Sequence, residues 1–156
     1  MQPNQPNQPN AFKNLQIIHV ALLIGMSVFV LISLYVHMNN REVERPLQVA
    51  CVISSLISIV AGFNIFKRKI IIARNSPVPG TKRMEMYRST CIIWWAMIEW
   101  PGLLATTSYI LTGNYAFFAL AIFHIMILLV FMPRKDNIVV LLNLTSNEVD
   151  QLEGKV

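Results

Sequence analysis

One carboxylate lies inside an apolar stretch that is long enough to cross a membrane. The stretch runs from Cys91 to Asn114, and within it Glu99 directly precedes Trp100, Pro101 and Gly102. An acidic side chain near the middle of a bilayer costs roughly 3 kcal/mol on insertion scales, so it normally faces protein or water rather than lipid. Glu99 is therefore the first candidate for a functional residue.

The neighbours of Glu99 predict a polar notch in a helix. Pro101 has no backbone N–H to donate and its ring clashes one turn back, so it frees the carbonyl of Met97 and is expected to kink the helix. Gly102 leaves room for a proton, a small cation or a close helix contact. Two hypotheses stay open: Glu99 binds H⁺ or Na⁺ reversibly, or it stays protonated and hydrogen-bonds a neighbouring helix.

Histidines are the candidate partners of this carboxyl group. Counted from the turn at Gly113, Glu99 and His124 lie at similar depths, so an antiparallel helical hairpin can bring them together. We expect His124 either to hydrogen-bond Glu99 or to donate to a backbone carbonyl one turn away. His19 lies nearer the start of the first apolar run, where it either lines an entry path or sits at the membrane interface.

Small residues recur every three or four positions in the second apolar run. Such a stripe lets helix backbones approach closely and lets hydroxyl groups bond across helices, so it predicts a packing face, with a pore lining as the alternative. The stripe consists of Ser54, Ser55, Ser58, Ala61 and Gly62.

The composition is typical of an integral membrane protein. Of the 156 residues, 54% are hydrophobic and 13% are charged, and the mean hydropathy is +0.51. The net charge is +5, but the positive residues flank the apolar runs, so no nucleic-acid partner is expected. Cys51 and Cys91 lack a CxxC spacing and a nearby His cluster, which predicts structural roles for both. We expect no metal, no cofactor and no enzymatic activity.

Four apolar runs have the length of a membrane span. Because lipid offers no hydrogen bonds to the backbone, each run is expected to be an α-helix, which predicts an all-α membrane bundle of two antiparallel hairpins. The runs are Leu15 to His37, Leu47 to Phe66, Thr90 to Leu111 and Tyr115 to Met132.

The two ends of the chain differ from this central region, 15–132. Residues 1–14 contain QPN three times and predict a disordered tail. Residues 133–156 predict a cytoplasmic tail with a short helix over Ser146 to Glu153, which begins at a Thr145 and Glu148 capping box and ends at Gly154.

The distribution of positive charge predicts the orientation. Eleven Lys and Arg residues fall on one side of the predicted spans, and only Arg41 and Arg45 fall on the other. The positive-inside rule therefore places both termini and a basic loop, 67–88, in the cytoplasm. That loop is expected to attract anionic lipid headgroups. The eleven are Lys13, Lys67, Arg68, Lys69, Arg74, Lys82, Arg83, Arg88, Arg134, Lys135 and Lys155.

Residues 61–114 locally resemble a hairpin of the c-subunit, or proteolipid, of rotary ATP synthases. The likeness lies in AGF at 61–63, in IARNSP at 72–77, and in an A-x-x-E centre from Ala96 to Glu99 that is followed by glycine. In that family the loop is cytoplasmic and the helix acid carries the coupling ion. The resemblance implies that Glu99 carries a proton or a sodium ion.

Over most of its length the chain resembles a group of small, uncharacterised bacterial four-helix inner-membrane proteins, some described as transporters. The shared outline is Ala21 to Gly25, Glu99 to Gly102, Leu111 to Asn114 and Leu142 to Glu148. The resemblance implies a multi-pass protein of the bacterial inner membrane.

Two functional hypotheses follow. The first is a non-enzymatic membrane protein that acts as a homo-oligomer or as a subunit of a larger complex through helix packing. The alternative is a proton- or sodium-coupled carrier or channel component that uses Glu99 supported by His124.

Overall fold

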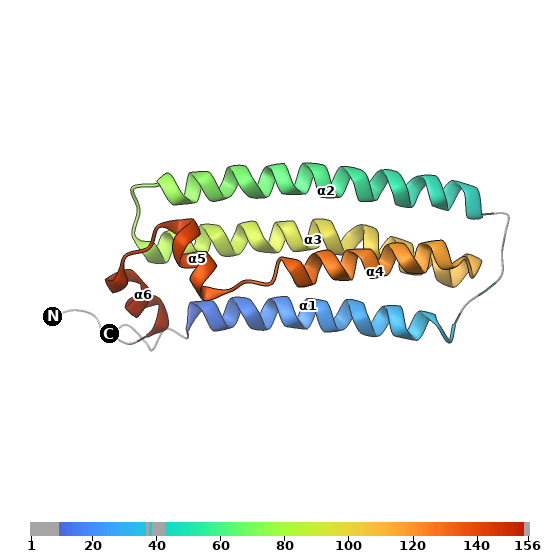
Figure 1. Cartoon of the computed structure of the whole chain (residues 1–156), viewed down its shortest axis with the longest axis horizontal. Coiled ribbons are helices and arrows are strands. Elements are labelled where there is room, and N and C mark those ends of the chain that lie inside the picture. The colour runs from blue at the N-terminus through green and yellow to red at the C-terminus, as the bar shows by residue number, and fades with distance from the viewer. Residues whose placement is uncertain (1–9, 37, 39–42, 155–156) are drawn as a thin grey trace.

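The computed structural model describes residues 10–36, 38 and 43–154. Within these residues the chain is all-α and forms six helices (Figure 1). They are α1 (Ala11–Ser33), α2 (Glu44–Asn75), α3 (Gly80–Thr112), α4 (Tyr115–Val130), α5 (Lys135–Leu142) and α6 (Ser146–Glu153).

The four long helices lie side by side, and α3 is the central one (Figure 1). It packs against α1, α2 and α4, and α1 packs in addition against α4. The short helices α5 and α6 cover the end of the molecule where α1 begins and where α2 turns into α3 (Figure 1). This end, with α5, α6 and the α2–α3 turn, is called the basic end below.

The prediction of a long loop over residues 67–88 was wrong, because residues 67–75 and 80–88 are helical. Helix α2 continues to Asn75 and α3 starts at Gly80, which leaves a turn of only four residues, 76–79. Lys and Arg are strong helix formers, and neither Gly nor Pro occurs between Phe66 and Ser76. The apolar pattern is therefore interrupted at Lys67, while the helix itself continues to Asn75, two residues before Pro77.

Helix α1 begins four residues before the predicted span. Asn10 caps it, because its side-chain oxygen accepts a hydrogen bond from the N–H of Lys13 at 3.1 Å. Residues 11–14 are thus helical rather than part of a tail, while residues 1–9 and the predicted span end at His37 lie outside the described residues.

The predicted C-terminal helix is confirmed, with both halves of its capping box and with Gly154 at φ 70°. An additional helix, α5, precedes it and packs against α2 and α3. Helix α4 ends at Val130 ahead of Pro133, and the axis of α5 is bent by 70° from that of α4. Most of the predicted tail is therefore folded onto the basic end.

Two of the described helices are long and apolar enough to cross a membrane, namely α1 and α2, with mean hydropathies of 2.5 and 2.2. The count is three if the bent pair α4 and α5 forms one span. Helix α3 is not among them, since Glu99, Pro101 and three tryptophans lower its hydropathy. Large apolar side chains nevertheless remain exposed along the outer faces of the long helices.

Candidate functional site

Glu99 lies on α3 at the edge of the packed core. Its side chain is half-buried, and it forms no hydrogen bond or ion pair with any other described residue. The next residue, Trp100, is 63% exposed, and Ala96, one turn earlier on α3, is exposed too. Glu99 and Trp100 therefore border the outer face of α3, which none of the other described helices covers.

Pro101 and Gly102 lie on the buried side of α3. The helix continues through Pro101, whose missing N–H leaves the carbonyl of Met97 without its usual donor. At Gly102 a Cβ atom would collide with Met26 of α1 and lie 3.0 Å from the Cβ of His124 of α4. Gly102 thus lies where α1, α3 and α4 meet, and a larger residue there would require the end of the Met26 side chain to move and His124 to shift slightly.

His124 is fully buried and is not hydrogen-bonded to Glu99. Its Nδ1 lies 2.9 Å from the carbonyl oxygen of Leu120, one turn back, and its Nε2 lies 3.2 Å from the hydroxyl of Ser55. A carbonyl only accepts, so Nδ1 carries the proton, and in the neutral ring Nε2 accepts from Ser55. Of the two predicted partners of His124, the structure therefore shows the backbone carbonyl one turn away and not Glu99. It also shows a hydrogen bond between α4 and α2 that the sequence did not predict.

His19 of α1 is also buried, with only 1% of its surface exposed, where α1 meets α3 and α4. Its Nε2 donates to the carbonyl of Leu128 at 3.0 Å, and its ring lies edge-on to Trp95 with centroids 4.7 Å apart. Nδ1 is buried without a partner among the described residues. His19 is therefore enclosed by its neighbours and joins α1 to the end of α4, instead of facing an opening or the interface.

The small-residue stripe of α2 packs within the chain. Ser55, Ser58 and Gly62 are buried, and Ser54 and Ala61 are half-buried. A Cβ atom at Gly62 would lie 2.7 Å from the ring of Trp94, which shows how closely α2 approaches α3. The stripe is consequently filled by α3 and α4.

The two cysteines are free and buried, as their predicted structural roles require. Cys51 of α2 lies with its Sγ 3.3 Å from the Oγ of Ser108 on α3, which adds a polar contact near the end of the stripe. Among the described residues, no group of three His, Cys, Asp or Glu side chains is arranged to hold a metal ion.

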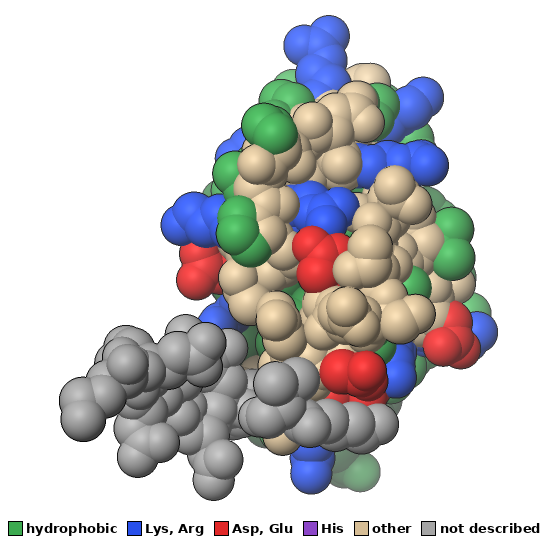
Figure 2. Space-filling view, turned by 90° about the vertical axis from the view of Figure 1, so that its left-hand side faces the viewer, with side chains coloured by type: hydrophobic (Ala, Val, Ile, Leu, Met, Phe, Trp, Pro, Cys, Tyr) green, Lys and Arg blue, Asp and Glu red, His purple; other side chains and the backbone are tan. Residues whose placement is uncertain are grey.

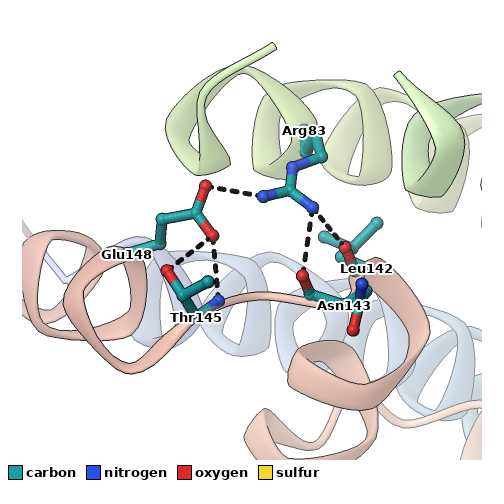
Figure 3. Close-up of polar contacts among 5 residues, drawn as sticks. All are labelled: Arg83, Leu142, Asn143, Thr145 and Glu148. Atoms are coloured by element: carbon teal, nitrogen blue, oxygen red, sulfur yellow. Dashed lines mark hydrogen bonds and ion pairs between the residues drawn. The ribbon is translucent and has the colours of Figure 1, made fainter. Parts of the chain in front are cut away.

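A polar cluster at the basic end joins the predicted capping box of Thr145 and Glu148 to Arg83, whose part in it was not predicted from the sequence (Figure 3). One nitrogen of Arg83 on α3 donates to the carbonyls of Leu142 and Asn143 at 2.8 and 3.1 Å, and the other donates to Glu148 at 2.6 Å. The second carboxylate oxygen of Glu148 accepts from the N–H and the hydroxyl of Thr145. Arg83 thus fastens the end of α5 and the start of α6 to α3.

This cluster has a marked electrostatic effect on Glu148. The backbone N–H of Thr145, together with the guanidinium of Arg83 and the Thr145 hydroxyl, lowers the pKa of Glu148 to about 2. The T-x-x-E pattern signalled the local part of the cluster. Arg83 carries no such signal, because it is one of seven positive residues between 67 and 88.

The remaining cations of the basic end have few partners. Figure 2 shows Lys and Arg side chains around this end, with Asp and Glu interspersed. Between residues 67 and 88 the only acid is Glu85, which pairs with Lys82 at 2.9 Å. Within the described part of the chain, five cations of this segment form no ion pair: Lys67, Arg68, Lys69, Arg74 and Arg88.

The chain matches no known protein-family model, and neither a curated protein nor a solved structure is significantly similar to it.

Proposed function

We propose that this chain is a non-enzymatic subunit of the bacterial inner membrane that associates with a second copy of itself or with other membrane subunits. In this proposal α1 to α4 form a four-helix bundle that crosses the membrane four times as two antiparallel hairpins. Both termini and the basic end face the cytoplasm, since the positive-inside rule acts on the cations of that end. The resemblance to small bacterial four-helix membrane proteins agrees with this location.

The observation that carries the proposal is the position of Glu99. A half-buried carboxyl group without a hydrogen-bonding partner is unfavourable in a bilayer, whether it is ionised or protonated. Trp100 beside it extends outward over an uncovered face. A partner helix that packs on this face would supply the missing hydrogen bond and cover the indole ring.

The outer face of α3 is preferred to the stripe of α2 as the contact surface. The small residues of α2 already contact α3 and α4, so a second chain could use them only if this chain unpacked. Glu99 and Trp100, by contrast, are accessible without any rearrangement.

The association can be tested by measuring subunit number in nanodiscs by single-molecule photobleaching. We expect more than one copy, or a co-purified subunit, for the native chain and for Glu99→Gln, which keeps hydrogen-bonding capacity. Glu99→Leu and Trp100→Ala should shift the population to single copies. Ile57→Ala, at an equally exposed apolar position of α2, is the matched control. A native chain that is monomeric and binds no partner would refute the proposal.

The half-exposed position of Glu99 also favours a second candidate function, a proton- or sodium-coupled carrier or channel component. The carboxyl group is open to exchange, because its side chain is only half-buried. His124 supports it only indirectly, through the packing at Gly102. Carbodiimide labelling across a pH series, with and without sodium, distinguishes the two candidates. Labelling of Glu99 that sodium or rising pH suppresses supports ion exchange, and an unreactive Glu99 excludes it.

A further inference from the structure

A cavity of about 400 Å³ lies between α2 and α3 at the basic end. Its walls come from the helical extensions that the sequence predicted to be a loop. Lys69 of α2 and Lys82 of α3 contribute ammonium groups, Ser89 contributes a hydroxyl, and Ile72 and Met86 contribute apolar surface. The cavity therefore combines positive charge with an apolar wall.

The cavity is lined by two lysines but by only one acid, Glu85, so its lining carries a net positive charge. Lys69 forms no ion pair with any described residue, and Lys82 is paired only with Glu85. Lys82 and Glu85 are 64% and 68% exposed, so water screens this ion pair and an incoming anion can replace the carboxylate. A lysine ammonium is a point charge that suits phosphate oxygens.

The apolar wall narrows the class of ligand. Half-buried Met86 lines the cavity on the side away from the α2–α3 turn, and further along the helix pair in that direction Ile65, Ile92 and Ile93 are exposed. An inorganic anion would leave this surface in water, whereas an amphiphile would cover it. We infer that the cavity binds an anionic glycerophospholipid, with its phosphate between Lys69 and Lys82 and its acyl chain along Met86 toward the apolar faces of α2 and α3.

This inference rests on the membrane location proposed above but not on the association through Glu99. The test uses the full-length protein purified in detergent, with native mass spectrometry to count retained lipids. The probes are phosphatidylglycerol, phosphatidylcholine and inorganic phosphate. The variants are Lys69→Gln, Lys82→Gln, the double variant of these two, and Glu85→Gln. Lys67→Gln is the control, because it removes an equal charge from α2 outside the cavity.

We expect the native chain to retain phosphatidylglycerol in preference to phosphatidylcholine. Each cavity lysine removed should weaken retention about fivefold, as expected for one lipid-facing charge. Glu85→Gln should strengthen retention, because it removes the competing carboxylate, and Lys67→Gln should leave it unchanged. Equal losses in Lys67→Gln and Lys69→Gln, or displacement of the lipid by inorganic phosphate at millimolar concentration, would overturn the inference. Since all variants keep Glu99, failure here is distinguishable from failure of the proposed association.

Discussion

Arg83 and Glu148 are 65 positions apart in sequence, and yet a nitrogen of the guanidinium donates to the carboxylate at 2.6 Å. Their side chains are only 11% and 20% exposed. The pair lies where α3 begins, α5 ends and α6 begins, so three helix ends are stabilised by two side chains. At Gly80 a Cβ atom would lie 2.8 Å from the Cβ of Glu148, which shows how closely α6 lies on α3.

Arg83→Gln should release α5 and α6 from the basic end. The substitution removes three donated hydrogen bonds and leaves the Glu148 carboxylate without its cation, which we expect to lower the free energy of unfolding by about 2 kcal/mol. Hydrogen exchange of residues 135–154 measures the release. Glu85→Gln breaks an exposed pair and should change stability by less than about 0.5 kcal/mol. Unchanged protection in Arg83→Gln would contradict this role.

The same pair predicts a loss of stability in acid. The folded pKa of Glu148, about 2, lies below its ordinary value of 4.5, so the stabilisation is complete above about pH 4.5 and disappears as the pH falls toward 2. Thermal unfolding in detergent from pH 6 to pH 2.5 should show this slope. In Glu148→Gln the carboxyl group is absent, and the slope should be smaller by that contribution. An identical slope in the variant would show that other groups cause the acid sensitivity.

Gly102→Ala should destabilise the contact of α1, α3 and α4. The added methyl group displaces the flexible end of Met26 and lies 3.0 Å from the Cβ of His124, which can yield less, so we expect a cost of about 1 kcal/mol, at the low end for overpacking. Gly25→Ala provides a matched control, because nothing outside its own helix lies within 4 Å of a Cβ there. The measurement is the melting temperature of each variant in detergent. Equal melting temperatures would contradict the close contact of α1, α3 and α4 at Gly102.

Ser55→Ala should leave Nε2 of buried His124 without a donor. The loss of this bond between α2 and α4 is expected to lower stability by about 1 to 3 kcal/mol. Ser54→Ala is the control, since the hydroxyl of Ser54 bonds only to the carbonyl of Cys51 in its own helix at 3.1 Å. Chemical unfolding of both variants in mixed micelles compares them. A loss as large in Ser54→Ala would argue against a specific role for the histidine contact.

Hydrophobic patterning predicted the long helices because lipid and core both select apolar side chains over bilayer length. It could not predict where the helices end: at Lys67 the apolar run stops, but nothing in the backbone chemistry stops the helix before Pro77. The capping box at Thr145 was predictable because all of its bonds are local.

Contacts between distant segments could not be predicted in the same way. Depth counting placed His124 level with Glu99, but depth leaves the rotation of each helix about its axis undetermined. That rotation turns His124 toward Ser55 and leaves Glu99 at the edge of the core. The sequence also could not predict that Arg83 is the partner of Glu148, because Arg83 differs from the other basic residues of 67–88 only by its position in the folded chain.

The long separation of Arg83 and Glu148 in sequence also has a consequence for biosynthesis. In the topology proposed above, Arg83 leaves the ribosome 65 residues before Glu148, so Glu148 does not neutralise its charge while the hairpin of α2 and α3 enters the membrane. With that orientation, its charge during this interval adds to those that retain the α2–α3 turn on the cytoplasmic side. Once α6 has been made and docks, the same guanidinium holds α6 to α3 instead.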